Sequence, residues 1–257
     1  MEKRGEGRKS GSAAAVIPAA GAGVRMGAER PKQFLLLDGK PILTVTLEAF
    51  ERCPVIDSVV LVVPGDVVPA CEREIVQRHG LTKVRRVVPG GARRQDSVRL
   101  GVEACPVGCD LVVVHDGVRP LVRSDLIERT VAAARDCGAA IAALPARDTV
   151  KQVRDGTWVE RTLDRRSLWL VQTPQAFLRA DLLEVHRRAV NEGWEEMPDD
   201  ASLLERAGLS VRVVDGAEDN IKVTTPNDLE VARFLLANRK GGGPPGGDRA
   251  SGDERRI

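Results

Sequence analysis

The sequence has no long hydrophobic run and no excess of charge of one sign. No apolar segment reaches the ~18 residues that a membrane-spanning helix needs, so we expect no association with a membrane. The first twelve residues are hydrophilic and lack the apolar core of a secretory signal, so export is not expected. Lys and Arg number 39 against 37 Asp and Glu, and a net charge of +2 lacks the basic field that dominates nucleic-acid binding. Local charges must therefore bind any anionic ligand.

Cysteine is scarce and odd in number. Five cysteines without a secretory signal indicate free thiols in a reducing compartment, and the cytoplasm is the expected location. Cys105 and Cys109 lie close together in the sequence, but no second pair and no nearby histidine complete the spacing of a zinc site. The sequence therefore predicts cysteines packed as thiols.

The two ends of the chain carry Gly, Pro and charge but almost nothing to bury. We therefore predict that residues 1–12 and 241–257 are disordered tails. The overall hydrophobic content of 42% is enough for a packed core, which we place in one domain over residues 13–240.

Short runs rich in Val and Ile alternate with segments of helical spacing. The alternation predicts a Rossmann-like α/β domain, a mainly parallel sheet flanked by helices, with strands buried on both faces. The predicted strands are 13–18, 58–63, 84–88, 111–115, 139–144 and 209–214, and the predicted helices are 42–52, 67–79, 96–104, 124–137 and 226–238.

Residues 147–170 break this alternation. Their polar and apolar residues alternate with a period near two around Asp155 and Gly156, which is typical of a β-hairpin. The segment has too few large apolar residues to form a core of its own. We therefore predict a projecting arm through which the chain forms a homodimer.

A glycine-rich segment, residues 18–27 (PAAGAGVRMG), follows the first predicted strand. Its small residues allow backbone N–H groups to approach phosphates closely, and Arg25 and Lys32 add positive charge. The spacing from Gly23 to Gly27 does not fit the dinucleotide-binding fingerprint, and the Gly-Lys-Ser/Thr of a Walker loop is absent. On its own residues the loop is either a phosphate site or a tight structural turn.

Ligands of open α/β sheets bind beyond the carboxyl ends of the strands, and polar residues follow three further predicted strands. Asp116 follows a buried strand and can ligate Mg²⁺, although a cap or turn role stays open. His115 beside it is expected to be a hydrogen-bonded core residue rather than a base. Asp219 and Lys222 follow the last predicted strand and are either a second charged pair of the site or a surface ion pair. Residues 90–97 read as a loop entering a helix, with Ser97 able to hydrogen-bond a base or ribose.

The ordered set of these motifs resembles the 2-C-methyl-D-erythritol 4-phosphate cytidylyltransferase family over residues 13–237. The motifs are 18–26 (PAAGAGVRM), 31–33 (PKQ), 90–97 (GGARRQDS), 115–116 (HD), 147–149 (RDT), 164–165 (DR), 172–175 (QTPQ) and 219–222 (DNIK). The sequence departs from the family pattern at Gly117, Ala92 and Pro198, and position 198 is given no role.

The resemblance implies transfer of CMP from CTP to 2-C-methyl-D-erythritol 4-phosphate, with release of pyrophosphate, in the non-mevalonate route to isoprenoids. It implies a divalent cation, Mg²⁺ or another, bound by Asp116 and less favourably by Asp219. It implies catalytic roles for Arg25, Lys32 and Lys222. The nucleotide-binding residues implied are Ala19, Ala20, Gly21, Gly23, Gly91 and Ser97, and those for the polyol phosphate are Asp116, Gly117, Thr149, Arg165, Thr173 and Lys222, with Thr149 and Arg165 supplied by the arm of a second subunit.

Two alternatives to this function stay open at the level of sequence. The same loop, carboxylate and arm would serve a cytidylyltransferase for another polyol phosphate, such as ribitol 5-phosphate. A regulatory module could keep the fold without catalysis, although the joint presence of Arg25, Lys32, Asp116 and Lys222 disfavours it.

Overall fold

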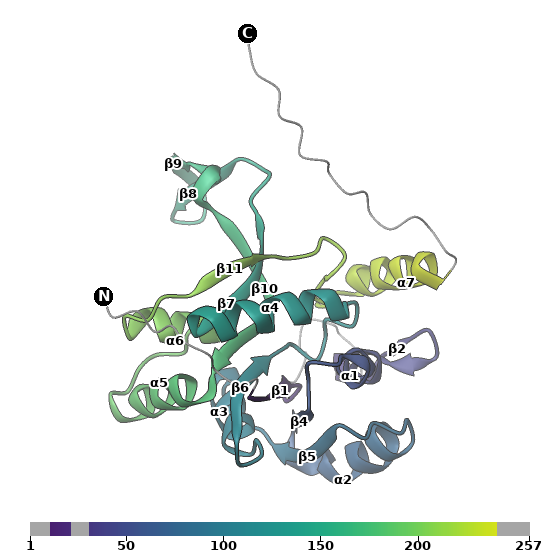
Figure 1. Ribbon diagram of the computed structural model, residues 1–257. Coiled ribbons are helices and arrows are strands. Elements are labelled where there is room, and N and C mark those ends of the chain that lie inside the picture. The colour runs from purple at the N-terminus through teal and green to yellow at the C-terminus, as the bar shows by residue number, and fades with distance from the viewer. Residues whose placement is uncertain (1–10, 22–30, 241–257) are drawn as a thin grey trace, which may run out of the picture.

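The computed structural model describes residues 11–21 and 31–240. Its centre is a sheet of seven strands in the order β11-β7-β10-β6-β1-β4-β5 (Figure 1). The strands are β1 (Ser12–Pro18), β4 (Ser58–Val63), β5 (Val84–Pro89), β6 (Cys109–Val114), β7 (Ala139–Pro145), β10 (Trp169–Leu178) and β11 (Arg212–Asp215). Four of the six neighbouring pairs are parallel, and β10 is antiparallel to both β6 and β7. The mainly parallel sheet is therefore confirmed.

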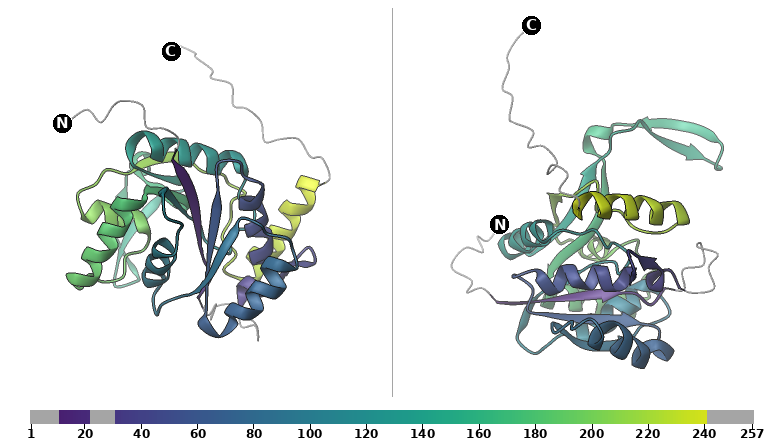
Figure 2. Two further views of the ribbon diagram at one scale, coloured as in Figure 1. Left: turned by 60° about the horizontal axis from the view of Figure 1, so that its bottom comes forward. Right: turned by 90° about the vertical axis from the view of Figure 1, so that its right-hand side faces the viewer.

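Helices cover both faces of the sheet, because successive residues of the central strands point to opposite sides. Ala13, Ala15 and Ile17 of β1 pack with α1 (Ile42–Arg52) and α4 (Ser124–Cys137). Ala14 and Val16 pack on the other side, with α3 (Arg94–Glu103), α5 (Arg179–Asn191) and α6 (Asp200–Arg206). A smaller cluster at the carboxyl edge joins α7 (Pro226–Lys240) to Val118 and Val223. The views in Figures 1 and 2 show these layers.

The predicted elements differ from the structure at a few places. Helix 67–79 is divided into α2 (Val68–Cys71) and the π-helical η4 (Glu72–Gln77). The prediction of strands buried on both faces is wrong for β5 and β11, because these two strands form the edges of the sheet. Ser12 belongs to β1 and not to the predicted tail, while residues 1–10 and 241–257 lie outside the described part of the chain. Within the main sheet and its covering helices, β10, α5 and α6 were not predicted.

The predicted hairpin is confirmed. Strands β8 (Val150–Arg154) and β9 (Trp158–Leu163) pair antiparallel and project away from the sheet (Figure 2, right). Asp155 and Gly156 at its tip have φ values of 52° and 69°, the left-handed backbone that a tight hairpin turn requires. Val153, Trp158 and Val159 are exposed by 46%, 68% and 60%, so the hairpin buries little apolar surface within the protomer.

Short elements at the carboxyl edge of the sheet complete the fold. The η2 turn (Lys32–Phe34) precedes β2 (Leu36–Leu37) and β3 (Lys40–Pro41), which form a separate two-stranded sheet. Further along the chain lie η3 (Gly65–Val67) and, after the hairpin, η5 (Arg165–Ser167).

Candidate active site

A cavity of about 190 Å³ opens at the carboxyl ends of β1, β5 and β6. Small residues from the loop after β1 line one side, and charged side chains from several separate segments line the rest. The lining residues are Pro18, Ala19, Ala20, Gly21, Lys32, Gln33, Gly91, Ala92, Arg93, Arg94, Ser97, Asp116, Val118 and Lys222. The strand-end rule therefore located this cavity correctly.

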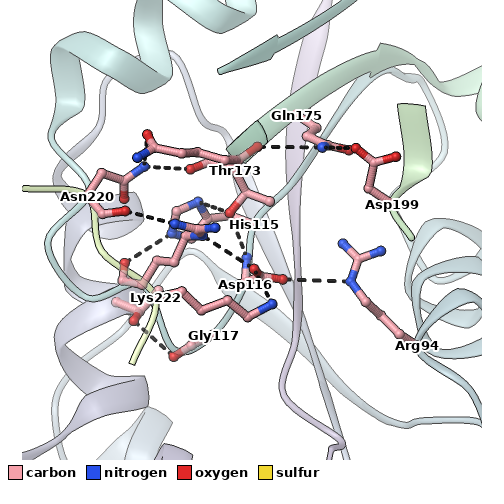
Figure 3. Close-up of polar contacts among 12 residues, drawn as sticks. Arg94, His115, Asp116, Gly117, Thr173, Gln175, Asp199, Asn220 and Lys222 are labelled. Atoms are coloured by element: carbon pink, nitrogen blue, oxygen red, sulfur yellow. Dashed lines mark hydrogen bonds and ion pairs between the residues drawn. The ribbon is translucent and has the colours of Figure 1, made fainter. Parts of the chain in front are cut away.

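Asp116 is the acidic centre of the cavity, and three cations surround it (Figure 3). Lys222 Nζ lies 3.0 Å and Arg119 Nε 3.4 Å from Asp116 Oδ2, and Arg94 Nε lies 3.7 Å from Oδ1. Burial by itself raises the pKa of this carboxyl, but Lys222, Arg94 and Arg119 more than offset it and hold the pKa well below its usual range. Asp116 is therefore an anion near neutral pH.

His115 and Thr173 support Asp116 from below. The Asp116 amide donates to Thr173 Oγ1 at 3.1 Å, the same hydroxyl lies 3.0 Å from His115 Nδ1, and His115 Nε2 lies 3.1 Å from the Arg119 carbonyl. His115 is completely buried, and this burial lowers its pKa to about 4. The prediction of a hydrogen-bonded core histidine is confirmed, because the ring is neutral and does not reach the cavity.

This histidine makes stability depend on pH. The folded-state pKa of His115 lies below its ordinary value of 6.5, so the unfolded chain binds a proton in this window that the folded chain does not. The stability that the neutral His115 contributes is complete above the ordinary pKa and is lost as the pH falls toward its folded-state pKa of about 4. We expect His115 to remove about 2 kcal/mol of unfolding free energy between roughly pH 7 and pH 5, and burial of His186 acts in the same direction.

Urea unfolding measured at both pH values checks this expectation. His115→Asn, which cannot titrate, should show a smaller loss on acidification even if its stability at neutral pH is already reduced. Equal losses for the two proteins would assign the pH dependence to other groups.

Asn220 positions Lys222 beside Asp116. The side-chain nitrogen Nδ2 of Asn220 donates to the Thr173 carbonyl at 2.8 Å and to Gln172 Oε1 at 3.2 Å. The Asn220 carbonyl accepts from Arg119 Nη1 at 2.8 Å. The segment that carries Lys222 is thus joined to β10 and to the loop after β6, which explains why residues distant in the sequence converge here.

Backbone groups dominate the side of the cavity formed by the loop after β1. The buried Gln33 side chain donates to the carbonyls of Ala19 at 2.8 Å and Gly21 at 3.4 Å. Ser97 Oγ accepts from the Gly91 amide at 3.1 Å. A Cβ on Gly91 would lie 2.5 Å from Asp96 Cβ, so the chain must be glycine to pass this close to α3.

The structure brings together most, but not all, of the predicted site residues. Ala19, Ala20, Gly21, Lys32, Gly91, Ser97, Asp116 and Lys222 line the cavity. Gly117 and Thr173 lie beneath it: the Gly117 amide donates to the Pro18 carbonyl and its carbonyl accepts from Thr46 Oγ1. Thr149, directly before β8, and Arg165, two residues after β9, are exposed at the base of the projecting hairpin. Gly23 and Arg25 lie outside the described residues.

Asp219, the weaker metal candidate, lies apart from the cavity. Its Oδ2 is 2.6 Å from Arg239 Nη2 of α7, and it is not among the lining residues. Of the two carboxylates predicted to bind a metal, Asp116 lines the cavity and Asp219 does not.

Sequence reasoning gave no role to three residues that shape the site: Gln33, Arg94 and Arg119. All three lie inside or next to quoted motifs, but a motif does not reveal which of its side chains turns inward. Arg119 follows Asp116 by three residues, a spacing that could have indicated the ion pair.

Asp116, the one carboxylate among the described residues that line the cavity, suits a cation that is bound partly by substrate phosphates. Within the described ranges, 11–21 and 31–240, no three His, Cys, Asp or Glu side chains are placed to hold a metal ion by themselves. Mg²⁺ commonly uses one or two carboxylates together with substrate phosphates, and the ionised Asp116 fits that requirement.

None of the helices in the described part of the chain is both long and apolar enough to span a membrane.

Comparisons with known proteins agree with this geometry. The family model for 2-C-methyl-D-erythritol 4-phosphate cytidylyltransferase matches residues 13–238. A protein of that name from Geobacter metallireducens is 46% identical over 228 residues, which cover 88% of this chain and 97% of the relative.

Two solved structures share the fold. The 4-diphosphocytidyl-2C-methyl-D-erythritol synthase of Anaerococcus prevotii superposes with a TM-score of 0.78 at 30% identity, covering 89% of this chain and 97% of that one. The 2-C-methyl-D-erythritol 4-phosphate cytidylyltransferase of Thermus thermophilus gives a TM-score of 0.71 at 35% identity, covering 86% and 98%. The chain therefore belongs to the 2-C-methyl-D-erythritol 4-phosphate cytidylyltransferase family of nucleotidyltransferases.

Proposed function

We propose that the chain transfers CMP from CTP to 2-C-methyl-D-erythritol 4-phosphate in the cavity around Asp116, in the non-mevalonate route to isoprenoids. The products are 4-diphosphocytidyl-2-C-methyl-D-erythritol and pyrophosphate. The observation that carries the proposal is one cavity that combines a backbone-lined side, with Gly21 and Gly91, and a charged side, with Lys32 and Lys222. The first suits a nucleoside and the second suits two clustered phosphates.

The proposed reaction is an in-line attack of the polyol phosphate oxygen on the α-phosphorus of CTP. A new P–O bond forms as the bond from the α-phosphorus to the bridging oxygen breaks, and pyrophosphate leaves with that electron pair. The attacking phosphate is already anionic near neutral pH, so no strong general base is required. The neutral, fully buried His115 is consistent with this. Catalysis must come from positioning and from neutralising charge.

Cations supply that neutralisation. Lys32 is proposed to stabilise the α-phosphate as charge builds up in the transition state, with Arg25 binding the triphosphate. Lys222, 3.0 Å from Asp116, is proposed to contact the α-phosphate and the incoming phosphate. A lysine held by a carboxylate in the cavity is already oriented when substrate arrives, which reduces the entropy lost on binding.

Asp116 would hold Mg²⁺ directly or through water, and the bound ion would supply neutralisation of charge on the triphosphate. The lowered pKa of Asp116 supports this role, since a metal ligand must be deprotonated.

Backbone groups of Ala19, Ala20, Gly21 and Gly91 are proposed to bind cytidine together with Ser97, and Gly23 belongs to the same loop. Gly117 and Thr173 are proposed to help bind the polyol phosphate. Both lie beneath the cavity, where Thr173 Oγ1 accepts a hydrogen bond from the Asp116 amide and the Gly117 amide donates to the Pro18 carbonyl.

The hairpin is proposed to form a homodimer and to bring Thr149 and Arg165 to the partner's substrate. The exposed Trp158 and Val159 support an interface, because an isolated hairpin of this kind leaves apolar surface in water. The cytoplasm is the proposed compartment, and five cysteines without a disulfide are compatible with it.

Pyrophosphate release tests the function. Purified protein with CTP and Mg²⁺ should release pyrophosphate with 2-C-methyl-D-erythritol 4-phosphate at a much higher kcat/KM than with ribitol 5-phosphate. A preference for ribitol 5-phosphate would support the alternative acceptor, and no release with either would reject the enzymatic function.

If each active site contains residues of both subunits, two different inactive chains should complement each other in a mixed dimer. Lys32→Ala removes a cavity residue and Arg165→Ala removes an arm residue, so a mixed dimer contains one complete site and should recover up to about half the activity per hybrid. Activity is measured after the two proteins are mixed and allowed to exchange. No recovery, despite exchange shown by differently tagged subunits, would place Arg165 in the site of its own chain.

A further inference from the structure

A buried carboxylate lies behind the cation that faces Asp116. Arg94 is the first residue of α3, and its guanidinium Nη2 lies 2.9 Å from Asp200 Oδ2. Asp200 is in the first turn of α6 and is only 1% exposed. Arg94 Nε faces the other way, toward Asp116 Oδ1 (Figure 3). One arginine therefore links the cavity to a carboxylate in the interior.

Burying Asp200 is costly unless a cation compensates its charge. His186 Nε2 lies 3.8 Å from Asp200 Oδ1, but burial lowers the pKa of His186 and leaves it neutral near pH 7. Arg94 is therefore the cation that compensates the charge of Asp200. Burial alone lowers the pKa of Arg94, yet Asp200 and Asp116 together raise it, so its charge is permanent.

The segment before α6 is also fixed to the start of α3. The Arg94 amide donates to Glu196 Oε1 at 3.1 Å, and the Met197 amide donates to Gln95 Oε1 at 3.2 Å. The backbone of Arg94 is thus held by the segment before α6, and its side chain by the first residue of α6. Such double attachment defines one rotamer for a side chain that is otherwise flexible.

The distance from Arg94 to Asp116 is as informative as the ion pair with Asp200. At 3.7 Å, Nε is beyond hydrogen-bonding distance of Asp116 Oδ1, although it still favours the anion. An arginine free to rotate would form the shorter, bidentate pair that guanidinium and carboxylate prefer, and would cover both Asp116 oxygens.

We propose that Asp200 is a positioning residue that holds the Arg94 guanidinium against a nucleotide phosphate in the cavity and prevents it from closing on Asp116. The inference rests on the proposed function for the identity of the nucleotide. Asp200 acts through Arg94, and Arg94 contacts the substrate. The segment that contains Asp200 had no assigned role in the sequence motifs.

A double-mutant cycle tests the proposal. The variants are Asp200→Asn, Arg94→Gln and the double variant, and Asp199→Asn is the matched control, because Asp199 caps α6 through Ser202 and asparagine is also a good cap. We expect Asp200→Asn and Arg94→Gln each to lower kcat/KM by about 10- to 100-fold, the usual effect of losing a group that orients a ligand-binding residue. Asp199→Asn should change it by less than about 3-fold.

The decisive comparison is between Arg94→Gln and the double variant. If Asp200 acts only through Arg94, the second substitution has no further effect, whereas an independent role multiplies the two losses. A further loss above about 5-fold would overturn the proposal. Since the double variant removes both charges together, this comparison stands even if Asp200→Asn alone does not fold, and thermal unfolding is recorded for every variant.

Calorimetric titration of the same proteins with CTP and Mg²⁺ separates this proposal from the function. The binding cycle should show the same non-additivity without any turnover. If the wild-type protein binds CTP but transfers CMP to neither acceptor, the proposed function fails while the cycle still decides whether Asp200 positions Arg94. Unchanged CTP affinity in Arg94→Gln would show that Arg94 does not contact the nucleotide.

Discussion

Replacement of Lys32 by alanine is expected to lower kcat by about 10²- to 10³-fold, the effect of losing one preorganised group that stabilises transition-state charge. Lys32 begins the η2 turn and lines the cavity. The neighbouring Gln33 is buried and anchors this turn to the Ala19 carbonyl, so the substitution should remove the ammonium group and leave the backbone in place. Steady-state pyrophosphate release, with kcat and KM determined separately for each substrate, is the measurement.

Lys40→Ala is the control for Lys32. Lys40 lies on β3 in the same part of the chain and pairs with Glu48 at 2.5 Å on the surface, so its loss should leave kcat within about 2-fold, as is usual for exposed pairs. A Lys32→Ala protein with altered KM and unchanged kcat would show that Lys32 binds substrate without assisting the chemical step.

Asp116→Asn is expected to lower kcat/KM by about 10³-fold. The substitution keeps the shape of the side chain but removes the proposed Mg²⁺ ligand, and a metal clamp contributes several kcal/mol of charge stabilisation. It also leaves Lys222 and Arg119 without the anion that orients them. Titrating activity against Mg²⁺ should show that the variant needs a higher metal concentration as well as turning over more slowly.

Asp219→Asn distinguishes the two acidic candidates. Asp219 is paired with Arg239 away from the cavity, so we expect kcat/KM and the Mg²⁺ requirement to stay within about 3-fold of wild type. If Asp219→Asn raises the Mg²⁺ requirement and Asp116→Asn does not, the metal assignment must be reversed. Thermal unfolding of both variants controls for loss of the fold.

The carboxyl-edge location of the site could be predicted because it depends on local patterns. Apolar runs such as 58–63 mark buried strands, and in a parallel sheet their ends lie together, which places Asp116 near the glycine-rich loop without any knowledge of contacts. The helices α1 and α4 were predicted to the residue, since their apolar positions repeat with helical spacing and Gly138 ends α4 in a left-handed conformation.

Strand β10 could not be predicted in the same way. A proline within a polar run, Gln172 to Gln175, argues against a central strand. In the structure β10 nevertheless pairs with β6 and β7. The strand tolerates Pro174 because its pairing with β7 is interrupted between Val171 and Gln175, where this proline lies. Helix α5, in contrast, could have been predicted from its sequence, because the apolar residues Leu182, Val185 and Ala189 repeat at helical spacing. All three are buried in the structure.

The ion pair between Arg94 and Asp200 shows where local patterns fail. Its two members lie on different helices, and only the packing of α3, α5 and α6 against one face of the sheet brings them together. Arg93 beside Arg94 illustrates the difficulty, because it turns instead to Asp96 at 2.8 Å and completes a capping box. Nothing in the sequence distinguishes the two arginines.

Strand β10 connects the base of the hairpin with the layer beneath Asp116. The first part of the strand pairs with β7 and is partly exposed at Trp169, Leu170 and Val171. A few residues later, Thr173 Oγ1 accepts a hydrogen bond from the Asp116 amide. A shift of β10 by one residue would turn its buried side chains outward, so the core opposes any such movement. The acidic centre is thus already assembled in an isolated protomer, and the proposed second subunit would add groups to the site without having to build it.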